Sequence, residues 1–237
     1  NTLINDGYND SKDSFELIDD AISSLHDATN AALSGSKKDM PAVLDNVIEK
    51  VLSNQQDVLA GVPTGIPKYD ANTGGQQDGG LIIYAARPAQ GKTARMCNEA
   101  RHQLKQGLAV AIHSLEMTPE QIICRIVGLE CEIEPGRIER AKLSNDEAAR
   151  VGDAVNWVRS CKLQIFEGIT VSSIVLESSM MQATMGLDII YVDYLQIATA
   201  GYSEKYKDVS AVSMAMKQLA KSLSVPVVCL AQLSRAV

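Results

Sequence analysis

The sequence predicts an α/β domain in which a mainly parallel sheet is covered by helices on both faces and is preceded by N-terminal helices. Two observations predict this fold class. From about residue 80 onward, short apolar runs alternate with longer amphipathic segments. The stretch LIIYAARPAQGKT, residues 81–93, joins one apolar run to a turn of small residues and to the next amphipathic segment. Strand, turn and helix in this order are typical of P-loop NTPases.

Residues 1–57 are expected to form a helical segment ahead of the sheet domain, residues 58–237. Apolar residues recur at helical spacing from about 13 to 35, and again from about 41 to 54. Both helices precede the first strand, so they lie outside the alternating core. The first helix is amphipathic, so it either folds back on its own domain or docks on a neighbouring subunit. The residues alone leave both alternatives open.

The sheet domain is expected to contain five strands joined by helices. A turn-rich stretch, residues 61–80, leads into the first strand, 81–85, which is apolar throughout and is therefore expected to be buried on both faces. Thr118 with Gln121 and Ser144 with Glu147 have the spacing of capping boxes, which predicts helix starts. The other expected strands are 108–115, 163–166, 189–192 and 225–231; the expected helices are 93–106, one beginning near 119, 144–159, 170–186 and 209–223.

The turn before Thr93 is a candidate phosphate-binding loop. Phosphate oxygens need several N–H donors converging on one point, and a turn of small residues followed at once by a helix N-terminus supplies them. We expect Lys92 to contact the β- and γ-phosphates of ATP or another NTP, and the Thr93 hydroxyl to ligate Mg²⁺. A chance GKT at a helix start is the alternative. The expected nucleotide-binding residues are Ala86, Arg87, Pro88, Ala89, Gln90, Gly91, Lys92, Thr93 and Ala94.

Ala86 departs from the pattern G-x-x-x-x-G-K-[ST], which has glycine at its first position. A methyl group is tolerated there if the backbone φ is negative. On that condition the departure weakens the match only slightly.

Polar side chains follow three of the expected strands, at the edge of the sheet where ligands bind in such folds. Asp193 follows the apolar run IIYV and is expected to hold Mg²⁺ through a water, as a Walker B carboxylate; the alternative is an aspartate that caps the next segment. Tyr194 comes next and cannot act as a base at neutral pH. We therefore expect Glu116, at the end of strand 108–115, to accept a proton from the attacking water, with a surface ion pair as the alternative.

Composition limits the classes of function. With 237 residues, 46% of them hydrophobic, the chain can bury the core of one enzyme-sized domain. The net charge of −7, from 22 basic and 29 acidic residues, means that any nucleic-acid binding is local. The five cysteines show no C-x-x-C spacing, and no apolar run approaches the roughly 20 residues of a membrane span. We expect a cytoplasmic protein with reduced thiols and no membrane contact.

Five segments follow one another along the chain: GVPTGIPKYDANTGG, AARPAQGKT, HSLEM, VDYLQI and VPVVCLAQLSR. Together they resemble the ATPase domain of the DnaB-type replicative DNA helicases, which belong to the RecA-like class. The resemblance covers about residue 61 to the last. It implies a ring, usually of six subunits, that encircles single-stranded DNA and moves along it by hydrolysing NTP at subunit interfaces, with primase and a helicase loader as further partners.

The resemblance also gives roles to residues that the patterns leave open. Alanine is common in the family at the position of Ala86. The last strand is expected to lie between the P-loop strand and strand 189–192, which would put Gln232 beside the γ-phosphate as a sensor. From the residues alone, Gln232 would be a loop amide. The helix from about 13 to 35 resembles the linker helix by which one subunit grips the next.

The resemblance implies that the loop at residues 198–208 faces the DNA channel. It interleaves Tyr202 and Tyr206 with Lys205 and Lys207, which suit stacking on bases and contact with phosphates. A solvated loop is the alternative. Family members continue beyond the position of Val237 with a second channel loop and with basic residues that reach a neighbour's active site. We therefore expect a C-terminally incomplete ATPase domain that hydrolyses NTP weakly by itself.

Two functions from different classes follow. The first is a replicative helicase motor, favoured by HSLEM and DYLQ. The second is a RecA-like ATPase that uses nucleotide to switch assembly or partner binding without unwinding DNA.

Overall fold

The computed structural model describes residues 59–168, 170–193 and 205–233, without the side chains of 205–208, and six residues upstream. Contacts divide the chain into two units, residues 1–58 and 59–237. The helix expected from about 13 to 35 lies outside the described residues. The six upstream residues are helical and are Met40, Pro41, Leu44, Asp45, Val47 and Ile48.

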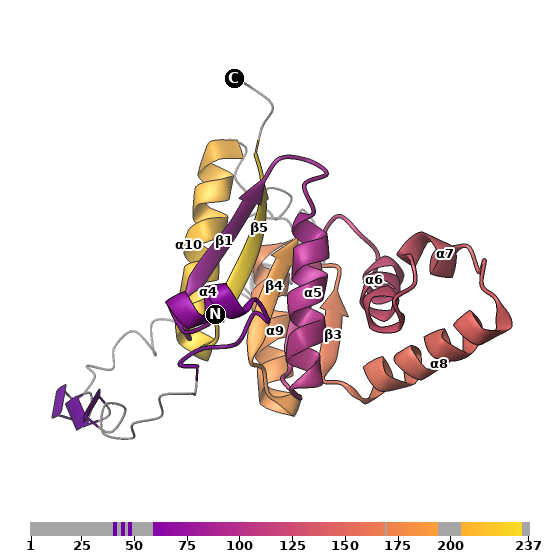
Figure 1. Cartoon of the computed structure of the whole chain (residues 1–237). Helices are drawn as coiled ribbons and strands as arrows, with labels where there is room; N and C mark the ends of the chain where they lie inside the picture. The colour runs from indigo at the N-terminus through magenta and orange to yellow at the C-terminus, as the bar shows by residue number, and fades with distance from the viewer. Residues whose placement is uncertain are drawn as a thin grey trace, which may run out of the picture. The chain divides into compact units, whose positions relative to one another are not determined.

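The second unit is built on a five-stranded parallel sheet in the order β1-β5-β4-β2-β3 (Figure 1). This order confirms that the last strand lies between the P-loop strand and the strand that ends at Asp193. The carboxyl ends of β1, β5, β4 and β2 are therefore neighbours along one edge. The strands are β1 (Leu81–Ala86), β2 (Val110–Ser114), β3 (Leu163–Phe166), β4 (Ile189–Asp193) and β5 (Val227–Gln232).

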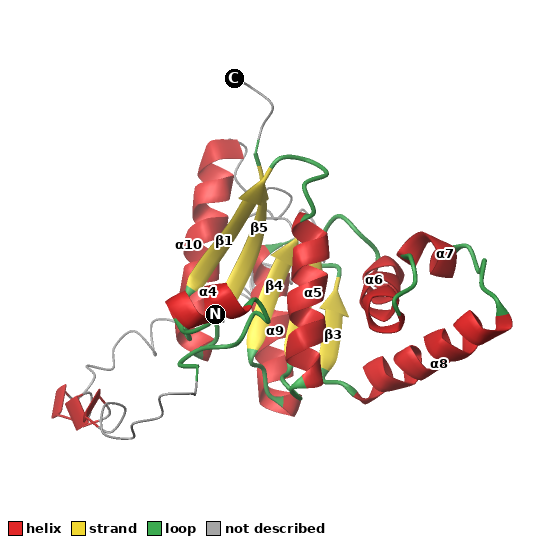
Figure 2. Cartoon of the chain, in the orientation of Figure 1, coloured by secondary structure: helices red, strands yellow, loops and turns green. Residues whose placement is uncertain are grey.

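Helices cover both faces of this sheet, as expected (Figure 2). One face packs on α5 (Lys92–Lys105) and α6 (Pro119–Cys131), and the other on α9 (Val171–Met185) and α10 (Lys205–Leu223). Side chains alternate along each buried strand, so that Tyr191 faces α5 while its neighbours Ile190 and Val192 face α9 and α10. The central strands are therefore buried on both faces.

The first strand differs from this pattern, and the expectation that β1 is buried on both faces is wrong. Its residues are half-buried or exposed in alternation, and Ile83 is 43% exposed. Within the described residues β1 is an edge strand, paired only with β5. An apolar run indicates that a strand can be buried, but it does not specify whether other strands pair with both of its edges.

Two short helices were not expected from the sequence. The helix α4 (Pro67–Thr73) lies inside the stretch expected to contain only turns, and α7 (Pro135–Glu139) lies between α6 and α8 (Asn145–Ser160). Each begins with proline, whose fixed φ suits the first helical position. The capping boxes expected at the starts of α6 and α8 are both present.

The last helix begins earlier than expected, at Lys205 rather than residue 209. Residues 205–208 are thus helical and do not belong to a loop, which corrects the boundary of the expected channel loop. No helix in the described part of the chain is both long and apolar enough to cross a membrane. All five cysteines are free thiols.

Candidate nucleotide-binding site

The P-loop connects the carboxyl end of β1 to the N-terminus of α5. Ala86 is not among the residues with positive φ, so the condition under which alanine is tolerated there is met. Ala89 and Gly91 do have positive φ, at 59° and 81°. Left-handed residues within a turn make successive N–H groups converge, which forms a concave anion-binding surface. A Cβ on Gly91 would meet nothing within 4 Å, so it is the backbone conformation that favours glycine there.

The hydroxyl of Thr93, in the first turn of α5, donates a hydrogen bond of 2.7 Å to Oδ2 of Asp193 at the end of β4. Asp193 is fully buried. Burial raises the pKa of Asp193, while the bond from Thr93 and the charge of Lys92 oppose that rise. Among the described residues, nothing donates a hydrogen bond to Oδ1 of Asp193. A buried carboxylate oxygen without a partner has capacity left for a cation.

These two side chains fit the ligand set of a nucleotide-bound Mg²⁺. Magnesium prefers oxygen ligands and is usually held by one or two carboxylates together with substrate phosphates, rather than by a cage of protein groups. The described residues contain no cluster of three or more His, Cys, Asp or Glu that could hold a metal without such help. Thr93 and Asp193 therefore suit a metal that arrives with its phosphates.

A cavity of about 380 Å³ is lined by Thr93 of this pair and by most of the residues expected at the nucleotide site. Glu116 comes from the turn after β2 and Gln232 from the end of β5, where it is in register with Ala86 of β1. The sheet order explains the convergence, because it makes β5 the neighbour of the P-loop strand. The lining residues are Pro88, Ala89, Gly91, Lys92, Thr93, Ala94, Glu116, Arg125 and Gln232.

Glu116 is held at the edge of this cavity by a short turn. The Ser114 hydroxyl donates to the Met117 carbonyl at 2.6 Å, and the Leu115 N–H donates to the Asp193 carbonyl at 2.7 Å. These bonds fix the chain on both sides of Glu116. No ion pair with a described residue involves Glu116, and its charge contributes to the raised pKa of Asp193. Its carboxylate is thus near the Thr93–Asp193 pair and open to the cavity.

Arg125 lines the same cavity and was not expected from the sequence. It lies on α6, whose residues Ile122 and Ile126 pack in the core, and it is half-buried. Its Nε atom is buried and makes no hydrogen bond with any described residue. Its charge lowers the pKa of Asp193 against the larger effect of burial. The signal in the sequence is a single arginine within the apolar run QIICRIVGLEC.

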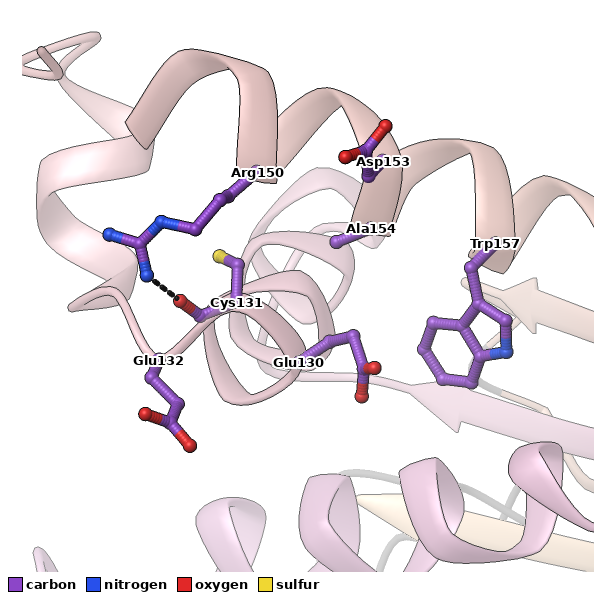
Figure 3. A pocket seen from close by; sticks show the side chains of 7 residues that line it. All are labelled: Glu130, Cys131, Glu132, Arg150, Asp153, Ala154 and Trp157. Atoms are coloured by element: carbon purple, nitrogen blue, oxygen red, sulfur yellow. Dashed lines mark hydrogen bonds between the residues drawn. The ribbon is translucent and has the colours of Figure 1, made fainter. Parts of the chain in front are cut away.

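Other expected residues lie apart from this cavity. Ala86 and Gln90 line an adjoining cavity of about 340 Å³ on the β1 side of the P-loop, together with Arg95. Arg87 lines neither of these cavities. Tyr202 lies outside the described residues, as do the side chains of Lys205, Tyr206 and Lys207. A separate cavity of about 330 Å³, called the second cavity below, lies between α6 and α8 and contains none of the expected site residues (Figure 3).

Comparison with known proteins agrees with the geometry in indicating a nucleotide-binding domain. Residues 61–237 match the family model of the DnaB-like helicase C-terminal domain. This chain belongs to that family. It therefore contains a helicase ATPase domain of the RecA-like fold, which implies nucleotide binding. Family membership favours the helicase motor over the ATPase switch.

Curated relatives of this DnaB-like domain are replicative DNA helicases. It is 33% identical to the replicative DNA helicase DnaB of Geobacillus stearothermophilus, over 100% of this chain and 54% of that protein. It is 32% identical to DnaB of Nostoc sp. over 100% of this chain and 28% of that protein. It is 34% identical to DnaB of Rhodothermus marinus over 99% of this chain and 26% of that protein. The chain thus spans between about a quarter and about half of the length of these relatives.

Two solved structures share the architecture. One is an ATPase domain that is 28% identical, with a TM-score of 0.76 over 84% of this chain and 73% of that one. The other is a DnaB-like replicative helicase, described together with its interactions with primase. It is 27% identical, with a TM-score of 0.72 over 92% of this chain and 54% of that one.

Proposed function

We propose that this chain is the motor part of a replicative DNA helicase that hydrolyses ATP, or another NTP, to move along single-stranded DNA and unwind duplex. The observation that carries the proposal is the convergence of the P-loop, the Thr93–Asp193 pair, Glu116, Arg125 and Gln232 on one cavity. These groups come from the P-loop, from α5 and α6, and from the carboxyl ends of β2, β4 and β5, and they have the types that phosphoryl transfer requires.

Lys92 and the N–H groups of the P-loop bind the β- and γ-phosphates. Thr93 and Asp193 would hold Mg²⁺, which would neutralise charge on the phosphate oxygens. Asp193 must be ionised for this role, and the neighbouring Lys92 favours its ionised form.

Three side chains act on the γ-phosphate side of the cavity. Glu116 accepts the proton of the attacking water, because it is a carboxylate that lines the cavity together with Lys92 and Thr93. Arg125 stabilises charge that develops on the γ-phosphate oxygens, since a guanidinium with an unpartnered, buried Nε can donate to them. Gln232 adds an amide from the adjacent strand and reports whether a γ-phosphate is present.

DNA and subunit contacts belong to the same proposal. Lys205 and Lys207, in the first turn of α10, meet backbone phosphates, and Tyr202 and Tyr206 stack on bases. The helix at about 13–35 docks on a neighbouring subunit of a ring, which we expect to be hexameric. Primase and a helicase loader are further partners, in the cytoplasm.

Strand displacement on a forked DNA, assayed with a full-length version, tests the proposal. ATP-dependent unwinding, lost in Lys92→Ala, is expected. DNA-independent ATP turnover without unwinding would reject the motor. Light scattering with and without residues 1–34 tests the docking helix: equal mass distributions at matched concentration would exclude a role in assembly.

A further inference from the structure

Glu99 is a buried carboxylate on α5 that the proposed chemistry does not use. It is 1% exposed and lies two turns after Lys92. Arg95 donates to Oε1 at 2.8 Å, and the Gln76 amide donates to Oε2 at 3.0 Å. The hydroxyls of Tyr84 and Tyr191 approach the carboxylate to 3.1 and 3.3 Å. A buried charge persists only when it is paired and hydrogen-bonded in this way.

Gln103, one turn further along α5, extends the cluster. The Tyr191 hydroxyl donates to Oε1 of Gln103 at 3.0 Å. The Gln103 amide donates to Oε1 of Gln76 at 3.2 Å and to the Pro63 carbonyl at 3.0 Å. Burial and the nearby Glu99 charge raise the pKa of both Tyr84 and Tyr191, so both hydroxyls keep their protons and donate. We call Gln76, Tyr84, Arg95, Glu99, Gln103 and Tyr191 the Glu99 network.

The Glu99 network joins the same three elements that form the phosphate site. Tyr84 precedes Ala86 on β1, and Tyr191 precedes Asp193 on β4, each by two residues and hence on the same side of its strand. On α5, Thr93 contacts Asp193, and Glu99 and Gln103 contact Tyr191 further along the helix. The helix thus touches β4 at two separated points. It cannot slide or turn against the strand without breaking one of them.

We propose that the Glu99 network is a positioning device that sets the spacing between α5 and β4 and so keeps Thr93 and Asp193 in place for Mg–nucleotide. This rests on the proposed function, because it takes the cavity to be a Mg–nucleotide site. The network residues do not touch the phosphates; they act through the elements that carry Thr93 and Asp193. Positioning of this kind is expected to act most on the metal, because coordination tolerates little displacement.

Two variants and a matched control separate positioning from plain stabilisation. Tyr191→Phe removes one hydroxyl and keeps the ring, and Glu99→Gln removes the charge and keeps the shape. The control is Asp70→Asn, which also neutralises a buried carboxylate. Asp70 is 7% exposed and accepts bonds from Thr64 and Gly65, outside α5 and β4.

The measurement is the dissociation constant of a fluorescent, slowly hydrolysed ATP analogue, with Mg²⁺ and with EDTA. In Tyr191→Phe and Glu99→Gln, the gain in affinity that Mg²⁺ brings should shrink roughly tenfold, while affinity in EDTA changes little. Asp70→Asn should keep the full gain in nucleotide affinity from Mg²⁺, even if its Tm falls as much as the Tm of the two network variants. Amide hydrogen exchange without nucleotide should be faster in α5 and β4 of the two network variants and unchanged there in the control.

An unchanged Mg²⁺ gain in both network variants, with Tm lowered as in the control, would show that the Glu99 network only stabilises the fold. Failure of the proposed function looks different: the unsubstituted chain would then bind the analogue neither with Mg²⁺ nor in EDTA. The double variant Glu99→Gln/Tyr191→Phe gives a further check. Because the two residues belong to one network, its loss of the affinity gain from Mg²⁺ should be smaller than the sum of the losses in the single variants.

Discussion

Two cavities of this domain have similar size and different chemistry. The P-loop cavity has a volume of about 380 Å³ and the cavity between α6 and α8 about 330 Å³, and both are lined by charged groups. In the second, Arg150 donates to the Cys131 carbonyl at 2.9 Å (Figure 3). Glu130 pairs with Arg101 and Lys105 of the neighbouring α5, at 2.7 and 2.8 Å. These charged groups of the second cavity therefore have partners within the fold.

The P-loop cavity instead has polar groups that are buried and not satisfied by the described residues. Oδ1 of Asp193 and Nε of Arg125 make no hydrogen bond there, whereas no lining residue of the second cavity has such an atom. Unpaired buried polar atoms are costly, so a fold retains them where a ligand completes them. Position in the topology and unsatisfied groups, not volume, therefore identify the site. The predictions below pair a residue of one cavity with a matched residue of the other.

The largest effect is expected from Lys92→Ala. It removes the charge that faces the β- and γ-phosphates, so nucleotide binding should weaken and turnover should be abolished. The matched control is Lys105→Ala, which removes the lysine that pairs with Glu130 beside the second cavity. Steady-state ATPase assays and nucleotide titration measure both. Retained turnover in Lys92→Ala would reject the P-loop cavity as the site.

Glu116→Gln should lower hydrolysis by about 10² to 10⁴ while nucleotide still binds, because the amide keeps the shape of the side chain but accepts no proton. Glu132→Gln, in the second cavity, should change neither quantity. Single-turnover hydrolysis together with an equilibrium binding titration separates the two effects. If Glu116→Gln turns over within about twofold of the unsubstituted protein, Glu116 is structural.

Arg125→Gln should lower the rate of hydrolysis by about 10²-fold, through loss of a donor to the γ-phosphate oxygens, with a smaller effect on nucleotide affinity. Arg150→Gln is the control, since Arg150 lines the second cavity, where it donates to the Cys131 carbonyl and pairs with Asp146 of its own helix at 3.5 Å. Equal rates of hydrolysis in the two variants would show that Arg125 has a structural role and does not act on the γ-phosphate. Comparison of ATP and ADP binding adds a second readout, because only ATP carries the γ-phosphate.

Much of the architecture could be predicted because alternating strands and helices leave a strong periodic signal. The capping boxes of α6 and α8 and the end of β4 at Asp193 depend on local sequence, and these predictions are confirmed. The short helices α4 and α7 are too brief to show a period. The edge position of β1 depends on neighbours that its own residues do not specify.

The site was predictable where its residues directly follow a strand or form the P-loop. Roles for Arg125 and Glu99 were not predicted from the sequence, and the reason is the same for both. Each is a charged residue on an amphipathic helix, where a charged side chain normally belongs to the solvated face. Only the packing of α6 over the cavity, and of α5 on Tyr191, gives them partners inside. The DNA-binding roles of Lys205 and Lys207 stay a prediction.

The smallest expected effect is on stability. It tests the contrast between the unpaired polar atoms at the P-loop cavity and the paired charges at the second cavity. Burial raises the pKa of Asp193, so the fold favours its neutral form. Asp193→Asn should therefore raise Tm without Mg²⁺, by about 2–4 °C for each kcal/mol gained in a domain of this size. The increase in Tm should be complete at pH values above the raised pKa that Asp193 has in the folded state. It should vanish as the pH falls to 3.8, the ordinary pKa of aspartate, because Asp193 is then neutral when folded. Glu130→Gln, which breaks satisfied pairs, should lower Tm instead, and thermal unfolding of both variants across pH measures the difference. A lower Tm for Asp193→Asn at neutral pH would mean that the Thr93–Asp193 pair stabilises the fold even without a metal.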